Sequence, residues 1–478
     1  MKKESIEELR DRSEGFSLDA TLAYIEELKT EKEYKIVSPY PTINGQLCRL
    51  VMDEEGLFTL WVKEMLSSPE NPPVTYQYDG YGFHRPFLLL GREGFFKVPS
   101  GVGSLSMTFN ASDSFNCKIV ELESQLQASP HFFRCILPMG SAERHATYVE
   151  SVSFNVGTTL HYRGLTKFRT RGIQINLFDY RLADGNNCWF VDTGDKCNYE
   201  DFKQIVEALI VHYGWIAGNL IRDTMTILFS DDRAFNHIKH HSFYRLSGSK
   251  RGLEAIRPRD MTDFVPKQDL EGERYLSTKT LTSLIELSLT NSAFYRACTI
   301  LAESHEYPLE IRASTYSVVL ETLKNIILEA NSEKINSIKN RTDAKALIKD
   351  LKAVVAAVSP SKFNNLLAVN QRIEQLNQVG NTDSFYKVFE LLGLSLSATD
   401  KECLKKRNDF LHGRLPFEDV RQEYLKSELA TVVFRMHLLL CALLLKMGGF
   451  SGYLFNNIRY RFPELKNEPV YRKLDFGS

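Results

Sequence analysis

The chain has 478 residues, of which 43% are hydrophobic and 25% are charged, and its formal net charge is −1. These proportions are typical of a globular protein, and the length allows two or three domains of about 100–200 residues each. A net charge near zero excludes the global basic field of a nucleic-acid coat protein, so any polyanion binding has to come from a local patch.

The eight cysteines are scattered and form no C-x-x-C pair, which argues against a zinc ribbon and against a disulfide scaffold. The first stretch, MKKESIEELRDRSEG, is charged and lacks the apolar core of a secretory signal. The longest apolar run, in HLLLCALLLKMGG, is about half as long as a bilayer span requires. We therefore expect a reduced, soluble, cytoplasmic protein with no membrane span.

Charged and single apolar residues alternate in residues 1–34, which predicts an N-terminal helical segment. Beyond it, apolar and polar residues alternate with a period of two in GSLSMTF (103–109), SVSFNVG (151–157) and GIQINLFDY (172–180). Such alternation is typical of strands with one buried face, and ADGNN (183–187) is typical of a hairpin turn. We predict a β-rich, mostly antiparallel domain over residues 35–240, with a regulatory or sensing role.

One helix is expected inside this β-rich domain, near residues 198–229. Asn198 is a preferred N-cap residue, and apolar residues follow it at helical spacing. Residues 241–270 are rich in glycine, serine, proline and charge, which predicts a linker between two domains.

Residues 271–478 are almost entirely helical in pattern. The clearest stretches are STYSVVLETLKNIILEA (314–330), DAKALIKDLKAVVAAV (343–358) and YLKSELATVVFRMHLLLCALLLKMGG (424–449). About six helices with short connections predict a bundle. The expected fold class is therefore α+β, with a β-rich N-terminal domain followed by an all-α C-terminal bundle.

Motifs for nucleotide binding by a P-loop or a dinucleotide fold are absent, and so are G-x-S-x-G and H-E-x-x-H. In HIKHH, His237 and His241 are four residues apart, but no third ligand lies nearby in the sequence, so we favour a solvated or nucleic-acid-facing cluster over a metal site. His161 lies among basic and aromatic residues in TTLHYRGLTKFRTRG. That mixture can bind phosphate and stack a base, although a charged outer strand face is the favoured interpretation.

The heptapeptide RNDFLHG (407–413) carries the strongest chemical signal. We predict that it ends a helix with Thr399 as N-cap, Glu402 as the capping-box partner and Gly413 beyond the last turn. At about 100° per residue, Arg407 falls in the middle of the apolar face.

Asn408 and His412 fall beside each other on the flank of the same helix, because residues four apart share a helix face. A buried guanidinium can donate two parallel hydrogen bonds to a phosphate, although it can also pair with a buried carboxylate. The helix dipole favours the protonated form of a histidine in a last turn, although such a histidine can also simply satisfy the last carbonyls.

Together these groups suit RNA cleavage without a metal. The histidine would exchange a proton with the 2′-hydroxyl or with the leaving oxygen, and the arginine would stabilise charge on the phosphorus. One histidine does not easily serve both ends of an in-line displacement, so a second copy from a symmetric dimer would help.

RNDFLHG resembles the R-x4-6-H motif of HEPN-domain ribonucleases, in the form that begins R-N and ends H-G. The similarity covers about residues 275–460, since it includes a bundle of suitable length, with the motif late in it and a long apolar helix after it. A β-rich half before such a bundle also resembles the ApeA type of anti-phage proteins. The resemblance implies a metal-independent endoribonuclease without a cofactor that acts as a homodimer through the bundle and leaves a 2′,3′-cyclic phosphate.

In such families the nuclease is an abortive-infection toxin, here with an unknown trigger at the N-terminal domain and with tRNA or mRNA as candidate targets. By match to the motif, Arg407 and His412 carry the chemistry and Asn408 supports them. Many HEPN proteins have an acidic or polar residue on an earlier helix, and Glu321, on the polar side of its helix, is the candidate here.

Local charge agrees with an RNA ligand. Residues 331–372 contain eight basic and three acidic residues, and basic residues also flank the motif. The predicted RNA contacts are Lys345, Lys349, Lys405, Lys406 and Arg414. Solvated helix faces are often rich in lysine too, so two alternatives stay open: a non-catalytic HEPN-like nucleotide- or protein-binding module, and a purely structural helical scaffold.

Overall fold

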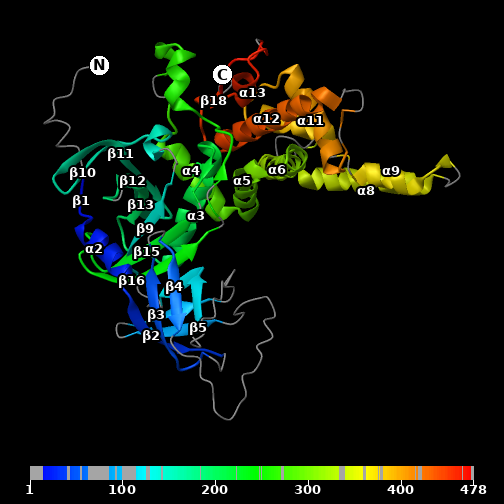
Figure 1. Ribbon diagram of the computed structural model, residues 1–478. Coiled ribbons are helices and arrows are strands. Elements are labelled where there is room, and N and C mark those ends of the chain that lie inside the picture. Colours follow the sequence, from blue (N-terminus) through cyan, green and yellow to red (C-terminus); the bar gives the residue numbers. More distant parts are fainter. Residues whose placement is uncertain are drawn as a thin grey trace. The chain divides into compact units, whose positions relative to one another are not determined.

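The computed structural model divides the chain into two units, which we describe separately: residues 1–252 with 275–289, and residues 253–274 with 290–478 (Figure 1). The structure describes residues 14–474 except for 40–42, 54–55, 63–85, 92–93, 100–114, 125–129, 141–143, 184, 222, 247, 249, 271–273, 333–337, 339, 359–361, 375, 377–380, 415, 418–421 and 466.

The first unit is built on one long sheet, in which every described strand pair is antiparallel except β1 with β10. The spatial order is β1-β10-β11-β12-β13-β9-β15-β16-β8-β6-β5-β2-β3-β4-β7. The strands are β1 (Glu14–Phe16), β2 (Lys32–Val37), β3 (Leu47–Met52), β4 (Phe58–Val62), β5 (Phe87–Gly91), β6 (Gly94–Val98), β7 (Phe115–Ile119), β8 (Glu121–Ser124), β9 (Phe132–Pro138), β10 (Val152–Val156), β11 (Thr159–Thr170), β12 (Ile173–Arg181), β13 (Asn187–Thr193), β15 (Thr224–Ser230) and β16 (Ile238–Arg245).

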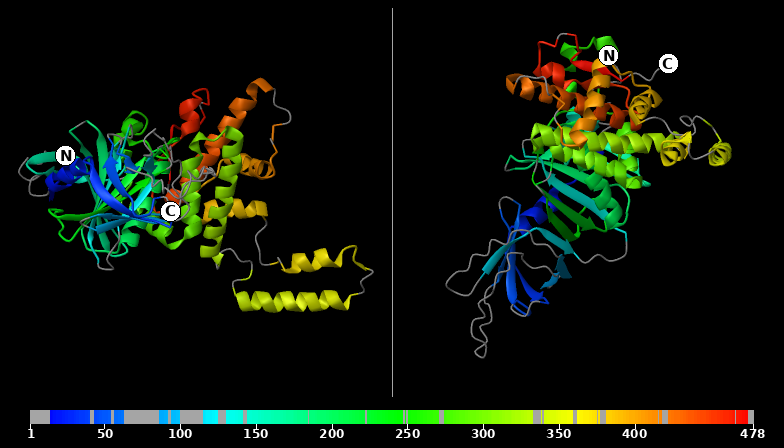
Figure 2. Two further views of the ribbon diagram at one scale, coloured as in Figure 1. Left: turned by 60° about the horizontal axis from the view of Figure 1, so that its bottom comes forward. Right: turned by 90° about the vertical axis from the view of Figure 1, so that its right-hand side faces the viewer.

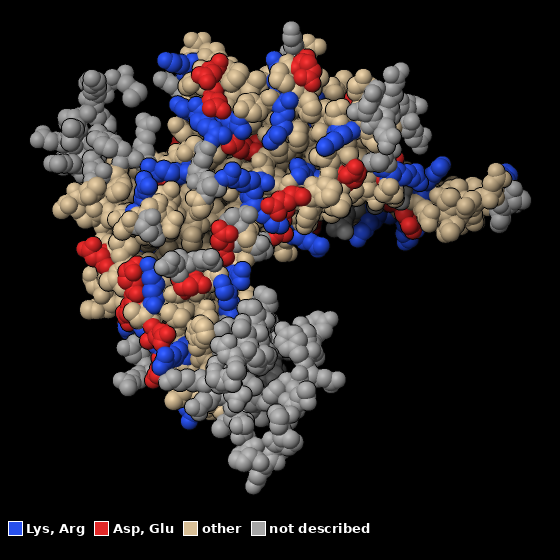
Figure 3. Space-filling model, viewed as in Figure 1, with Lys and Arg blue, Asp and Glu red and all other residues tan. Residues whose placement is uncertain are grey.

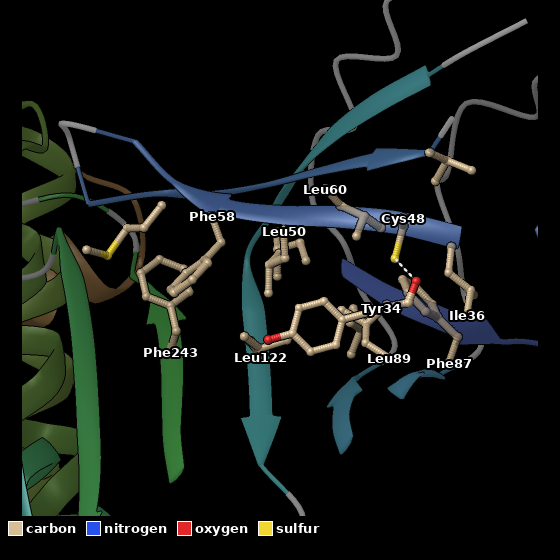
Figure 4. Packing of buried hydrophobic residues seen from close by; sticks show 14 of the residues in the cluster. Tyr34, Ile36, Cys48, Leu50, Phe58, Leu60, Phe87, Leu89, Leu122 and Phe243 are labelled. Atoms are coloured by element: carbon tan, nitrogen blue, oxygen red, sulfur yellow. Dashed lines mark hydrogen bonds between the residues drawn. The ribbon is translucent and has the colours of Figure 1, made fainter. Parts of the chain in front are cut away.

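Alternating side chains of this sheet contribute to apolar cores, among them two at different places along the sheet. One lies under the strands at the β2–β5 end, where Leu50, Phe58, Leu89 and Phe243 point toward one another (Figure 4). The other lies under β9 to β13 and includes Phe178. Because successive residues of a strand face opposite sides, this alternation fixes which face of each strand is buried.

Among the described residues, three helices accompany the sheet: α2 (Asp19–Leu28), α3 (Tyr199–Ile216) and α4 (Thr278–Thr290). Most residues of α3 are buried, which makes it a core helix of this unit. On its buried side, Nε2 of His212 lies 2.9 Å from Oγ of Ser288 on α4. A short pair, β14 (Asn219–Leu220) and β17 (Lys250–Arg251), follows outside the main sheet.

The predicted strands in 151–157 and 172–180 are confirmed as β10 and β12, and the turn at 183–187 is confirmed by the pairing of β12 with β13. The prediction for 103–109 lies outside the described residues. The N-terminal segment is not only helical, because its described part also contains β1 and the start of β2.

Two further expectations need correction. Asn198 is the N-cap of α3, as predicted, but the helix ends at Ile216 rather than near 229. Gly218 then takes a φ of 62°, a left-handed conformation that commonly ends a helix, and residues 224–230 form β15. The predicted linker at 241–270 contains regular structure instead, namely β16, β17 and the 3-10 turns η2 (Pro258–Asp263) and η3 (Lys267–Leu270).

The second unit is a helical bundle around α6, which packs against α5, α10, α11 and α12. Its elements are α5 (Ser292–Glu303), η4 (Ser304–Glu306), α6 (Leu309–Ala330), α8 (Arg341–Ala357), α9 (Leu366–Glu374), α10 (Asn381–Leu391), α11 (Ala398–Leu411), α12 (Gln422–Met447), β18 (Tyr453–Phe455), α13 (Asn457–Arg461) and β19 (Tyr471–Lys473). The helices α8 and α9 lie side by side (Figure 2). The α+β class is confirmed, with the addition of the small β18–β19 pair.

The long apolar helix α12 is largely buried in this bundle, where it packs against α6. Among the described residues, it is the helix long and apolar enough to cross a membrane, but 83% of its most apolar window is buried inside the structure. This burial is what a core helix of a soluble protein shows.

The stability of the first unit should depend on a buried ion pair between Arg134 and Asp192. Arg134 donates from Nε and Nη2 to the two oxygens of Asp192 at 2.9 and 2.7 Å, and its guanidinium lies 4.3 Å from the ring centroid of Phe235. We expect Asp192→Ala to lower the free energy of unfolding by about 3–5 kcal/mol, because it leaves a buried charge without its partner. Chemical denaturation measures this loss.

The matched control is the exposed pair of Arg49 with Glu31, whose Nη1 and Oε2 atoms are 2.8 Å apart. Glu31→Ala should cost less than about 1 kcal/mol, because water screens an exposed pair. Equal losses in the two variants would contradict the importance assigned to the buried pair.

Candidate active site

The motif helix α11 starts two residues earlier than predicted. Its N-cap is Ser397, whose Oγ accepts from the Asp400 backbone N–H at 3.1 Å, while the Asp400 carboxylate accepts from the Ser397 N–H at 3.0 Å. This is a complete capping box. Thr399 and Glu402, the predicted cap residues, lie instead in the first turns of the helix.

Asp400 also ties α11 to two other elements. Its carboxylate is fully buried and accepts from Nη1 of Arg435 on α12 at 3.0 Å and from Nη1 of Arg472 on β19 at 2.9 Å. Arg435 makes a further ion pair with Glu468. Burial alone raises the pKa of Asp400, but the charge of Arg472 and the hydrogen bonds from Ser397 and the two arginines outweigh it, so the pKa lies below its ordinary value of 3.8.

The other end of α11 is fixed as tightly. Gly413 has a φ of 68°, and its N–H donates to the carbonyl of Phe410 at 3.1 Å, while the Arg414 N–H donates to the carbonyl of Asp409 at 2.8 Å. These two bonds make a Schellman motif with His412 as the C-cap. Oγ of Ser314 on α6 also donates to the Phe410 carbonyl at 3.0 Å, which holds the last turn against α6.

Arg407 is buried, as the helical projection predicted, with only 5% of its surface exposed. Its guanidinium carbon lies 3.3 Å from the ring centroid of Phe385 on α10, so the two planar groups are in close contact. Nε is buried and has no hydrogen-bond partner among the residues that the structure describes. Burial lowers the pKa of Arg407, and the negative charge of Glu321 opposes that effect.

Glu321 is the nearest carboxylate, but it does not hold Arg407 tightly. Its Oε2 lies 3.9 Å from Nη1 of Arg407, which is beyond hydrogen-bond distance. Its Oε1 instead accepts a hydrogen bond from Nζ of Lys324, one turn further along α6. The structure therefore brings the predicted Glu321 to the site and adds Lys324, which is only 7% exposed.

Asn408 and His412 follow the buried Arg407 by one and by five residues, and both are exposed. Within the described part of the chain neither side chain makes a hydrogen bond, so both are available to a ligand.

The predicted RNA contacts are mostly exposed; four lie on α8 and α11, and Arg414 follows the end of α11. Lys345, Lys349, Lys405 and Arg414 face solvent. Lys406 is less available, because its Nζ lies 3.2 Å from Glu402 and 5.2 Å from the ring centroid of Phe417. On the face seen in Figure 3, lysine and arginine are interspersed with aspartate and glutamate, so positive charge gathers only locally.

The described histidines outside the motif form no metal-binding group. His237 precedes the strand β16, in which a spacing of four does not have the meaning it has on a helix. His241 is buried, with Nδ1 2.9 Å from the hydroxyl of Tyr24, and burial lowers its pKa to about 3. No group of three His, Cys, Asp or Glu side chains that could hold a metal ion occurs among the described residues.

The basic strand around His161 is better explained as an outer strand face. The His161 ring stacks on Phe154, with centroids 5.1 Å apart. Arg169 and Arg171 are paired with Asp195 and Asp201 at 3.1 and 2.8 Å. Each of these two arginines therefore has a carboxylate partner on the surface of the unit.

Comparison with known proteins adds no relative. No family model, no curated protein and no solved structure matches the chain. The site is therefore interpreted from its own geometry.

Sequence inspection missed Lys324, Phe385 and Asp400. Lys324 follows Leu320 by four residues on the apolar stripe of α6, the same signal that singled out Arg407. Phe385 gave no signal, because an aromatic residue on an apolar helix face is ordinary core.

The network at Asp400 predicts how the second unit responds to acid. Asp400→Asn should lower its free energy of unfolding by about 3–5 kcal/mol near neutral pH, because two arginines lose a buried carboxylate. A carboxyl group with a lowered pKa stabilises the fold above pH 3.8 and loses this effect as the pH falls through the lowered value. The difference between the two proteins should therefore shrink in that acid range, as measured by denaturation across pH.

Glu402→Gln on the same helix is the control, because it removes only an exposed pair with Lys406 and should cost less than about 1 kcal/mol. A difference between wild type and Asp400→Asn that stays constant into strong acid would contradict the role given to this carboxylate.

Proposed function

We propose that the protein is a metal-independent endoribonuclease of the HEPN type that acts in the cytoplasm. The observation that carries this proposal is Arg407, a buried guanidinium without a hydrogen bond among the described residues, followed five residues later by the exposed His412 at a fixed helix end. A buried cation with unused donors is a site for an anion, and a nearby histidine supplies a group that exchanges protons near neutral pH.

The proposed reaction uses His412 and Arg407 of the bundle, with a second His412 from a partner copy as the proton donor to the leaving oxygen. His412 removes the proton of the RNA 2′-hydroxyl, whose oxygen then attacks the adjacent phosphorus. Arg407 stabilises the negative charge that develops on the phosphate oxygens. The bond to the 5′-oxygen breaks, that oxygen takes up a proton, and a 2′,3′-cyclic phosphate remains.

A homodimer through the bundle fits this chemistry. One histidine per chain serves one end of the displacement, and a two-fold axis would bring a second His412 to the other end. Apolar side chains are exposed near this helix end, with Ile311 and Val318 on α6 and Leu411 on α11. Their exposure supports a contact with a second copy there.

An endoribonuclease of this kind suits a toxin in abortive infection, in which RNA cleavage stops growth of an infected cell. The β-rich unit would then carry the sensing or restraining function, and Asn408 would assist in orienting the substrate. The substrate class is RNA, with tRNA and mRNA as candidates.

His412→Ala should abolish RNA cleavage and toxicity on expression, because the proton-transfer group is lost. Arg407→Lys should lower the cleavage rate by at least about a hundredfold, since an ammonium cannot reproduce the planar guanidinium that lies against Phe385 and donates two hydrogen bonds to a phosphate. Cleavage of a labelled RNA by the purified protein in the presence of EDTA is the measurement.

His237→Ala is a matched control, because this exposed histidine lies in the other unit. Cleavage that survives in His412→Ala, or that requires a divalent metal, would remove this mechanism. Retained cellular function without Arg407 and His412 would favour a non-catalytic nucleotide- or protein-binding module instead.

The lysines of α8 should contribute affinity for RNA rather than chemistry. In a His412→Ala background, Lys345→Gln with Lys349→Gln should reduce the slope of log affinity against log salt concentration by about 1.4 for single-stranded RNA, at about 0.7 for each phosphate contact. Fluorescence anisotropy at several salt concentrations measures the slope.

Lys35→Gln with Lys279→Gln is the control, since these two exposed lysines lie in the first unit. An unchanged slope in the α8 variant would show that this helix does not contact the RNA.

A further inference from the structure

Two buried cations share one carboxylate and one aromatic ring in the bundle. Nζ of Lys324 lies 4.6 Å from the ring centroid of Phe385, and the guanidinium carbon of Arg407 lies 3.3 Å from the same centroid. Lys324 and Arg407 are 7% and 5% exposed. Glu321 is the carboxylate near both of them.

The carboxylate is not shared equally. Its Oε1 accepts a hydrogen bond from Lys324, whereas its Oε2 is 3.9 Å from Nη1 of Arg407. Lys324 is three residues after Glu321 on the same helix, so their pairing requires no movement of the bundle. Arg407 sits on another helix and keeps a buried Nε without a partner among the described residues.

A carboxylate near a guanidinium would ordinarily form a close, two-pronged ion pair with it. Such a pair would use the donors that a phosphate needs and would cancel the positive charge of the site. The three groups carry one net positive charge in either arrangement, but with Lys324 bound to Glu321 the uncompensated charge lies on the buried Arg407 guanidinium. That excess charge is what an anionic ligand would neutralise.

We propose that Lys324 is a positioning residue that holds Glu321 away from Arg407 and so keeps the guanidinium free to bind a phosphate group. This inference deepens the proposed function and rests on it for the identity of the anion as an RNA phosphodiester. Its physical content, an anion site kept open by a competing lysine, is tested with inorganic phosphate alone.

The test is a double-mutant cycle on the full-length protein, with phosphate binding measured by calorimetry or by NMR titration. Lys324→Met keeps the length of the side chain and removes the charge, so Glu321 is released to pair with Arg407. We expect phosphate affinity to fall by about tenfold, in the middle of the range for groups in one network. Glu321→Gln alone should bind phosphate at least as tightly as wild type.

The decisive variant is Lys324→Met with Glu321→Gln. Without a carboxylate to close on Arg407, the lysine is no longer needed, and affinity should return to within about threefold of wild type. Lys324→Arg, which keeps a cation beside Glu321, should also stay within about threefold of wild type. A merely structural lysine would not be rescued by changing its neighbour.

Two results would overturn the inference. Wild-type affinity in Lys324→Met would show that the lysine does not govern the site. Affinity in the double variant as low as in Lys324→Met would show that Lys324 contacts the anion itself. Melting curves of all variants identify a protein that has lost its fold, in which case Lys324→Gln with Glu321→Gln replaces the double variant.

The same proteins separate this inference from the proposed function. If wild type cleaves no RNA while phosphate binding follows the expected pattern, the ribonuclease proposal fails and the anion site stands. If wild type cleaves RNA through His412 but its phosphate affinity does not change in the Lys324 and Glu321 variants, the ribonuclease proposal stands and the inference about Lys324 fails.

Discussion

Asp400 is a buried carboxylate that two arginines hold, and the position of the motif helix depends on it. It closes the capping box of α11 and joins that helix to α12 and to β19 through Arg435 and Arg472. A buried ion network of this kind contributes little net stability compared with apolar packing, but it allows few alternative arrangements. The helix end that carries His412 and the face that carries Arg407 are therefore set from the opposite end of α11.

Much of the architecture follows from local patterns. Alternation with a period of two revealed β10 and β12, and helical periodicity revealed α6 and α12, because in each case one face is buried. The order of the strands does not follow in this way. In the sheet, β9 lies between β13 and β15, and such pairings between distant segments depend on side-chain packing that no short window contains.

In the candidate site too, some features follow from neighbouring residues in the sequence and others depend on contacts between distant helices. Ser397 with Asp400 and Thr399 with Glu402 are equally good cap pairs by sequence, and only the burial of Asp400 against distant arginines decides between them. The burial of Arg407 was predictable, since it occupies an apolar helix position. Its approach to Glu321 and Phe385 was not, because it depends on how α6, α10 and α11 cross.

The glycine that ends RNDFLHG has a different role from the residues before it. Gly413 adopts a left-handed backbone with open space where a Cβ would lie, so its constraint is conformational rather than steric or chemical. Asparagine is the other residue that visits this region readily. The heptapeptide thus combines the residues of the proposed chemistry with the glycine that ends the helix. Related sites can be sought with either glycine or asparagine at the last position.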